Sequence, residues 1–130
     1  AQILEGYRIL KERGVEHFGI HAFLASNTIS NGYYPELARQ LFSLVVKIKE
    51  ECGIALEFVN LSGGVGIPYR PEQEATDIFL IGEKVREVYE EILVKNGLGH
   101  IRLCSELGRY VLGPHGALIT KVIHFKNNVI

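Results

Sequence analysis

The sequence has few cysteines and no cysteine motif. Its two cysteines, Cys52 and Cys104, lie far apart, form no C-x-x-C pair and have no histidine at metal-ligand spacing. This excludes a cysteine-based metal motif, and we expect no metal site. Both side chains are predicted to be reduced, mostly buried thiols of a cytoplasmic protein.

Excess positive charge and long apolar runs are also missing. The formal net charge is -1 and no basic cluster occurs, which argues against a nucleic-acid partner. Charge or glycine interrupts every hydrophobic run, so no segment approaches the length of a membrane span, and we expect no membrane partner. The first residues also lack the order of basic, apolar and small residues that is typical of a signal peptide.

The composition is that of an ordinary soluble globular domain. The chain has 130 residues, of which 47% are hydrophobic and 22% charged. Ala1 leads directly into helix-like sequence, and the last residues continue a strand-like pattern without a stop signal. We therefore expect the chain to be a fragment of a longer protein.

Hydrophobic periodicity predicts strands that alternate with helices. Helices are expected over residues 2–13, 35–51 and 77–95, and strands over 18–25, 54–61, 100–104 and 117–125. This alternation is typical of right-handed βαβ units with a parallel sheet. A complete β/α barrel needs about 250 residues. The predicted fold is therefore α/β, as the C-terminal half of a (β/α)8 TIM-type barrel whose last strand leads out of the barrel.

Polar and glycine residues gather where three predicted strands end, which predicts one shared site. The run Leu61–Tyr69 contains Gly63, Gly64 and Gly66 after a strand. Glycines there can form a concave turn whose N–H groups bind a phosphate, or a tight turn without any ligand. The run matches neither a Walker A loop nor a dinucleotide fingerprint.

Two further motifs lie at the other strand ends. Glu106 precedes Arg109 by three residues; the carboxylate could hold a protonated ring nitrogen and the guanidinium a phosphate or carboxylate, or the two could form a structural ion pair. His21 is either a functional imidazole or a hydrogen-bonded core residue, and it shares a strand face with Phe23. Ser26 is either a phosphate ligand or an ordinary turn serine.

Together these motifs resemble those of the diaminopimelate decarboxylases, which belong to the alanine-racemase-type decarboxylases that depend on pyridoxal 5'-phosphate. The matching segments are His21–Asn27, Ser62–Tyr69 and Glu106–Tyr110 followed by Gly113-Pro114 and Gly116. The resemblance implies that residues 1–130 are part of a pyridoxal-phosphate-binding barrel domain, followed in the family by a β domain.

The resemblance also implies roles for single residues. Ser26 and the amides of Gly63 and Gly64 would hold the cofactor phosphate, and Glu106 would face the pyridine nitrogen. Arg109 would reach a substrate carboxylate. The remaining residues expected to border the cofactor are His21, Phe23, Leu107 and Gly108.

The sequence departs from the family pattern at several of these positions. Phe23 stands where the family usually has a histidine that stacks on the cofactor ring. Ala25 and Ser62 replace usual glycines, and Leu107 replaces a usual proline. The family's Schiff-base lysine belongs to an early strand that precedes this segment, so we expect no catalytic residue in this chain and no activity from it alone.

The implied reaction is decarboxylation of meso-diaminopimelate to L-lysine and carbon dioxide, a step of lysine biosynthesis, by a homodimeric cytoplasmic lyase. A related decarboxylase of amino acids or polyamine precursors is one alternative. A short protein that binds pyridoxal phosphate or another phosphate without catalysis is a second. A half-barrel module without a ligand is a third, and its open sheet edges would favour dimers or aggregates.

Overall fold

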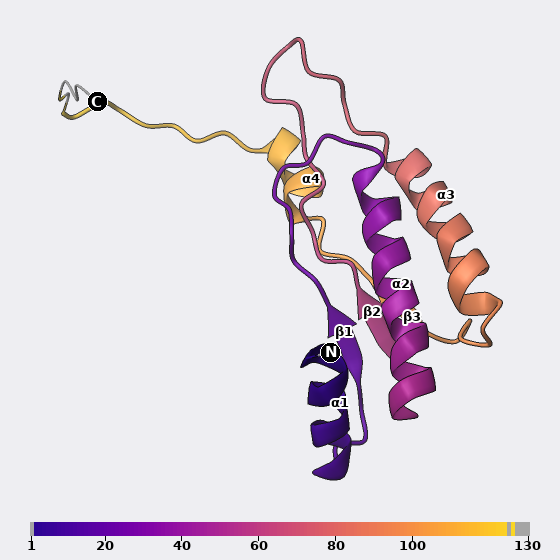
Figure 1. Ribbon diagram of the computed structural model, residues 1–130. Helices are drawn as coiled ribbons and strands as arrows, with labels where there is room; N and C mark the ends of the chain where they lie inside the picture. The colour runs from indigo at the N-terminus through magenta and orange to yellow at the C-terminus, as the bar shows by residue number, and fades with distance from the viewer. Residues whose placement is uncertain (1, 125, 127–130) are drawn as a thin grey trace.

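The computed structural model describes residues 2–124 and 126 and has an α/β architecture with parallel strands (Figure 1). The strands are β1 (Gly19–His21), β2 (Phe58–Asn60) and β3 (Arg102–Cys104), in the order β1-β2-β3. The longer helices are α1 (Gln2–Glu12), α2 (Tyr33–Cys52) and α3 (Ile78–Tyr89), which a π-helical turn, η1 (Glu90–Val94), continues. A short helix α4 (Gly108–Leu112) and a 3-10 turn η2 (Gly113–His115) follow β3.

The helix ends follow from local sequence. Asp77 caps α3, because its carboxylate accepts hydrogen bonds from the N–H groups of Phe79 and Leu80, both at 3.0 Å. Helix α2 ends at Gly53, whose φ of 61° is in the left-handed region that favours glycine. Lys11 of α1 donates a hydrogen bond to the carbonyl of Gly53 at 3.1 Å, so α1 contacts the C-terminal end of α2.

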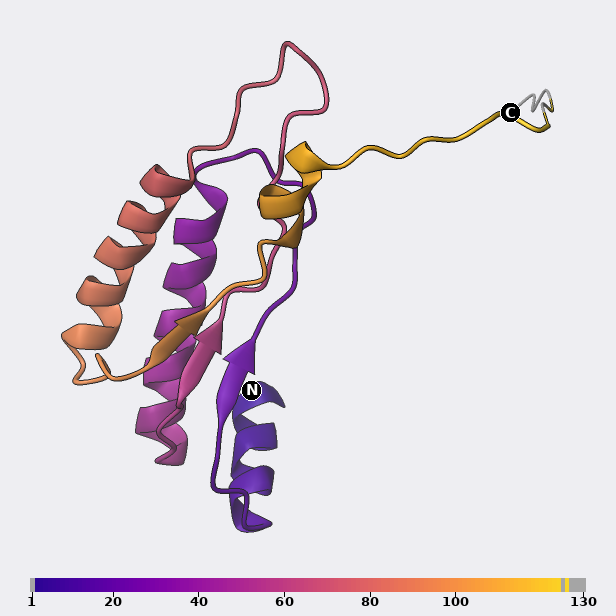
Figure 2. The same cartoon turned by 180° about the vertical axis from the view of Figure 1, so that it is seen from behind.

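The sheet has one covered and one open face. Helices α1, α2 and α3 lie on the same side of the strands, as Figures 1 and 2 show from opposite directions. Val59 of β2 is fully buried against them. Phe58 points to the other face, where its ring lies over Gly19; a Cβ on Gly19 would meet that ring at 2.3 Å.

The core lies between the helices and the covered face of the sheet. Its largest fully buried side chains are Phe42, Ile48, Leu56, Leu93 and Leu98. Periodicity predicts an inner face of the helix over residues 35–51 made of Leu37, Leu41, Leu44, Val45 and Ile48. All of these are buried except Leu44, which is half-buried.

Several sequence predictions are wrong in extent. Each strand is shorter than predicted, with three paired residues in each of β1 and β2. Residues 117–124 form no strand and extend away from the rest of the chain (Figure 1), and Phe125 lies outside the described residues. Because a strand needs a neighbour for its N–H and C=O groups, an apolar segment rich in β-branched residues does not form one by itself. Cys104 is exposed, whereas Cys52 is buried as predicted.

Candidate functional site

The three strands end side by side and bring the predicted motifs to one edge of the sheet. In the register His21 pairs with Asn60, and Asn60 pairs with Cys104. Ser62 and Glu106 follow Asn60 and Cys104 by two residues, and the segment before Ser26 returns to the loop, since the Ala25 carbonyl lies against Gly64. The expectation that these segments share one region is therefore confirmed.

The glycine loop packs tightly against both neighbouring segments. A Cβ on Gly63 would lie 2.2 Å from the carbonyl oxygen of Glu106, and one on Gly64 would lie 2.4 Å from that of Ala25. Gly64 also has a φ of 97°. Thr28 donates its N–H to the Gly64 carbonyl at 2.7 Å and accepts from Gly66 at 2.8 Å. Glycine is required here because larger side chains would separate the three strand ends.

The same loop leaves backbone donors unused. Within the part of the chain that the structure describes, the N–H groups of Gly63 and Gly64 donate to no protein acceptor. Ser26 directly follows Ala25, whose carbonyl lies against Gly64, and it is exposed. The two amides and the hydroxyl are thus the donor types from which a phosphate site is built.

Ser62 is a strained member of this loop. Its φ of 61° is unusual for a residue with a side chain, and its Oγ is buried without a hydrogen-bond partner among the described residues. Left-handed backbone costs a non-glycine residue about 1–2 kcal/mol, and an unpartnered buried hydroxyl adds to that cost. A glycine would adopt this backbone conformation without that strain.

We expect Ser62→Gly to raise the free energy of unfolding by about 1 kcal/mol, because relief of the strain outweighs the added freedom of the unfolded chain. Urea unfolding measures this. Ser30→Gly is the matched control: Ser30 is exposed, and its Oγ accepts from the Gly32 N–H at 3.3 Å, so this change should lower stability. Equal losses in both variants would contradict the assignment of strain to Ser62.

Glu106 points its carboxylate toward the end of β2. Its Oε1 accepts a hydrogen bond from the Asn60 side-chain amide at 2.7 Å and lies 3.9 Å from Nε2 of His21. Its backbone N–H donates to the Ser62 carbonyl at 2.8 Å, which joins this residue to the glycine loop. The carboxylate is half exposed, and its second oxygen accepts no hydrogen bond from the described residues.

Arg109 does not pair with Glu106, so the alternative of a mutual ion pair is wrong. Helix α4 carries Arg109 away from the strand end, and its Nη1 donates to the hydroxyl of Tyr69 at 2.6 Å. The guanidinium carbon also lies 6.0 Å from the Tyr69 ring centroid, a cation–π contact. The two charged groups are therefore free to bind different partners.

The other predicted cofactor contacts differ in their exposure. His21 and Phe23 are exposed, with 65% of the Phe23 surface accessible, so the alternative of a buried core His21 is wrong. Gly108 begins α4, and nothing lies near the position of a Cβ there. Leu107 instead packs its side chain with Tyr34 and Val65, so a contact from Leu107 to a ligand at the strand ends would come from its backbone.

Tyr34 of α2 contacts the glycine loop through its hydroxyl group. It is 3% exposed, and its hydroxyl donates a short hydrogen bond to the Gly63 carbonyl. Burial raises the pKa of the Tyr34 hydroxyl to about 12, the neighbouring Tyr33 adds to the rise, and a backbone hydrogen bond from Val65 opposes it.

This pKa predicts a loss of stability in alkali. In the unfolded chain Tyr34 ionises near its ordinary value of about 10, whereas the folded protein keeps it neutral to about 12. The contribution of neutral Tyr34 to the free energy of unfolding is complete below a pH of about 10. It is lost as the pH rises toward the folded-state pKa of about 12. We therefore expect the stability advantage of the unsubstituted protein over Tyr34→Phe to shrink across this range in urea titrations. A constant difference would contradict the shifted pKa.

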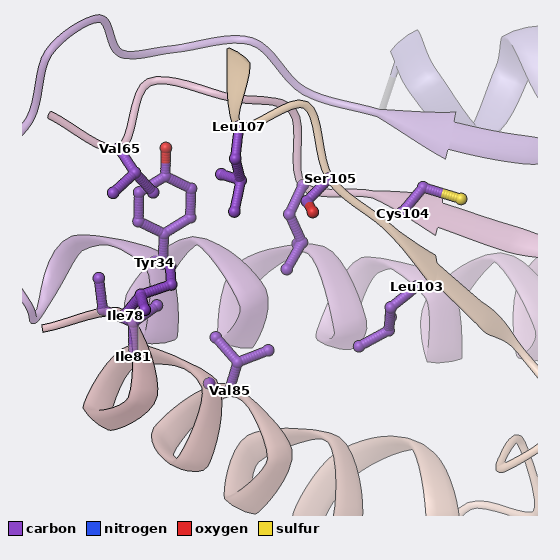
Figure 3. Close-up of a pocket in the computed structure, with 11 residues that line it drawn as sticks. Tyr34, Val65, Ile78, Ile81, Val85, Leu103, Cys104, Ser105 and Leu107 are labelled. Carbon is purple, nitrogen blue, oxygen red and sulfur yellow. The ribbon is translucent and has the colours of Figure 1, made fainter. Parts of the chain in front are cut away.

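An apolar pocket of about 290 Å³ lies behind the loop, between α2, α3 and the end of β3 (Figure 3). Tyr34, Val65, Ile81, Val85, Leu103 and Leu107 line it. It is on the helix side of the sheet and reaches the ends of β2 and β3, because Leu61, Cys104 and Ser105 also line it. Among residues 2–124 and 126, no three side chains of His, Cys, Asp or Glu are grouped as metal ligands, and no helix is long and apolar enough to cross a membrane.

Comparison with known proteins identifies the family. Residues 4–113 match the model of the pyridoxal-dependent decarboxylases, pyridoxal binding domain. The chain belongs to this family. The resemblance stated from the motifs is thereby confirmed, and pyridoxal phosphate is the cofactor of the domain.

Individual relatives agree with this assignment. Over 124 residues, 95% of this chain, it is 33% identical to protein TabA of Pseudomonas amygdali pv. tabaci and 33% identical to diaminopimelate decarboxylase of Methanothermobacter thermautotrophicus. The crystal structure of M. jannaschii diaminopimelate decarboxylase in co-complex with L-lysine superposes with a TM-score of 0.58 and 28% identity, over 67% of this chain and 20% of that one. The chain spans 29% of the length of the two curated relatives.

The residues at the strand ends fit the family's cofactor. Two glycines form a cradle that a Cβ would fill. Among the described residues, the N–H groups that line it donate to no protein acceptor, and one carboxylate oxygen beside it accepts from no protein donor. No lysine occurs in the strands or in the segments 22–32, 61–77 and 105–109 that follow them. Sequence reasoning did not single out Asn60 or Tyr34, and it included Tyr69 only as the last residue of the glycine run. Their roles are revealed by the side-chain contacts.

Proposed function

We propose that this chain supplies the phosphate-binding and ring-nitrogen-binding part of the active site of a pyridoxal-phosphate-dependent amino-acid decarboxylase. One observation carries the proposal: in a member of this family, the glycine cradle and the Glu106 carboxylate meet at the ends of neighbouring strands. Residues 1–130 are part of the barrel domain, and the complete protein is a homodimer of the cytoplasm.

Each residue has one task in this proposal. Gly63 and Gly64 donate backbone N–H groups to the cofactor phosphate, and Ser26 adds its hydroxyl. Glu106 accepts a hydrogen bond from the pyridine N–H and so keeps that nitrogen protonated. The bound cofactor supplies an electron sink for the negative charge that decarboxylation leaves behind. His21 and Phe23 border the ring from the end of β1.

Arg109 binds a carboxylate of the substrate in this proposal. It is exposed on α4, and Tyr69 holds its side chain by one hydrogen bond, which leaves the other guanidinium N–H groups available. A planar guanidinium can bind a carboxylate with two parallel hydrogen bonds, so it orients the substrate as well as attracting it.

We propose meso-diaminopimelate as the substrate and L-lysine as the product, because the relatives named above include two diaminopimelate decarboxylases, one in complex with L-lysine. A related amino-acid decarboxylase is the second candidate, because the family model that residues 4–113 match describes pyridoxal-dependent decarboxylases without naming one substrate. Turnover of a panel of amino acids and diamino acids by the complete protein distinguishes the two.

Borohydride reduction of the protein from its source, with pyridoxal phosphate bound, tests the proposal. Peptide mapping by mass spectrometry is expected to find the reduced cofactor on a lysine outside residues 1–130. A 130-residue protein that binds pyridoxal phosphate reversibly and takes up no label would instead support the non-catalytic binding module. A protein that neither binds nor is labelled would overturn the proposed function.

A further inference from the structure

Asn60 lies between the glycine loop and Glu106, and its side chain forms a hydrogen bond to each of them. It is the last residue of the middle strand, and its backbone pairs with His21 on one side and Cys104 on the other. Its side chain makes two hydrogen bonds: Nδ2 donates to Oε1 of Glu106 at 2.7 Å, and Oδ1 accepts from the N–H of Ser62 at 2.8 Å.

These two bonds determine the orientation of the amide. The Ser62 N–H can only donate, so it holds the Asn60 oxygen toward the glycine loop. The NH₂ group must then face Glu106, and a carboxylate is the acceptor with which it forms the stronger, charge-assisted bond. One side chain thus sets the position of the carboxylate relative to the phosphate cradle.

Other groups near Glu106 do not replace this contact. His21 is 3.9 Å away, beyond hydrogen-bond distance, and Arg109 is bonded to Tyr69. Among the described residues, Asn60 makes the one side-chain hydrogen bond to the carboxylate, and that bond uses Oε1. The second oxygen remains available to an N–H donor on the open face of the sheet.

We propose that Asn60 is a positioning residue that acts through Glu106: it holds the carboxylate in line with the cofactor's pyridine nitrogen and ties it to the loop that holds the phosphate. A neutral donor suits this task, because a cation at the same place would compete with the protonated ring for the carboxylate. The inference rests on the proposed function and adds a residue to its site.

The test uses the complete protein loaded with pyridoxal phosphate that carries ¹⁵N in its ring. The chemical shift of this nitrogen reports whether it is protonated. Asn60→Leu, close in volume but without the amide, should move the signal toward the unprotonated value and lower kcat about tenfold, the size of effect typical of residues that orient a ligand-binding group. Asn60→Ser, whose hydroxyl is too short to reach Glu106, repeats the test with a smaller change.

A double-mutant cycle separates positioning from a general structural role. In a Glu106→Gln background, Asn60→Leu should have no further effect on the nitrogen signal, because its target is gone. Additive effects, or an unchanged signal in both Asn60 variants, would overturn the inference. Asn96→Leu is the control, since Asn96 donates to the Ile92 carbonyl at 2.7 Å on η1, away from the strand ends.

A failure of the proposed function gives a different experimental result from a failure of the inference about Asn60. If the unsubstituted protein does not bind pyridoxal phosphate, the proposed function is wrong and the inference with it. If that protein binds the cofactor with a protonated nitrogen, and Asn60→Leu binds it in the same state, the inference alone is wrong.

Discussion

Replacing Gly64 by alanine is expected to destabilise the fold by about 2–4 kcal/mol, the sum of left-handed strain and overpacking. The φ of Gly64 is 97°, and the new methyl group would lie 2.4 Å from the Ala25 carbonyl oxygen. That oxygen belongs to the backbone, so the contact is relieved only if the end of β1 moves away from the loop. We therefore expect the variant to lose its affinity for pyridoxal phosphate as well.

Urea unfolding and a cofactor titration measure the two effects of Gly64→Ala. Gly82→Ala is the matched control, because Gly82 lies inside α3 and nothing is within 4 Å of its added Cβ. Alanine favours the helix over glycine, so this control should gain about 0.5–1 kcal/mol. A Gly64→Ala protein as stable as the control would show that the loop does not need glycine at this position.

Replacing Arg109 by alanine is expected to lower kcat/KM of the complete decarboxylase by about 10- to 100-fold. This corresponds to the loss of hydrogen bonds to a charged group, about 1.5–3 kcal/mol. Arg109 is exposed and, within the described part of the chain, its side chain donates one hydrogen bond, to Tyr69, so its loss removes little packing. Stability should therefore stay almost unchanged, which separates a substrate-binding role from a structural one.

Steady-state kinetics of Arg109→Ala are best compared with those of Arg86→Ala. Arg86 lies on α3, is exposed and forms an ion pair with Glu90 at 3.3 Å. It has the same charge but lies on the helix side of the sheet, away from the strand ends that hold the site, so its replacement should leave turnover unchanged. Equal turnover of both variants and the unsubstituted protein would remove Arg109 from the site.

The helices and the location of the site were predictable because their signals are local. The periodicity of residues 35–51 and the stop at Gly53 predicted α2 to within about two residues. A parallel sheet follows from the alternation of strands and helices, and its carboxyl ends are where polar loop residues meet. Gly63, Gly64 and Glu106 could therefore be assigned to one region without coordinates.

Contacts between distant residues were not predictable in the same way. Arg109 is three residues from Glu106, which suggested a pair, yet it bonds to Tyr69, 40 residues away along the chain. Residues 117–124 are rich in apolar and β-branched side chains, as a strand is, but pair with no strand among the described residues. The spacing of charged and apolar residues predicts which helix, strand or ion pair a segment is able to form. Which residues it contacts in the folded protein depends on the rest of the fold.

The amino-acid sequence alone therefore determined the α/β class, the parallel order of strands and helices, the family resemblance and the residues of the phosphate loop. Only the tertiary structure decided that Asn60 holds Glu106, that Tyr34 supports Gly63 and that Ser62 is strained. The physical reason is the range of the interactions. Periodicity and turn propensity act within a few residues, while these hydrogen bonds and close packings form only when strands far apart in the chain lie side by side.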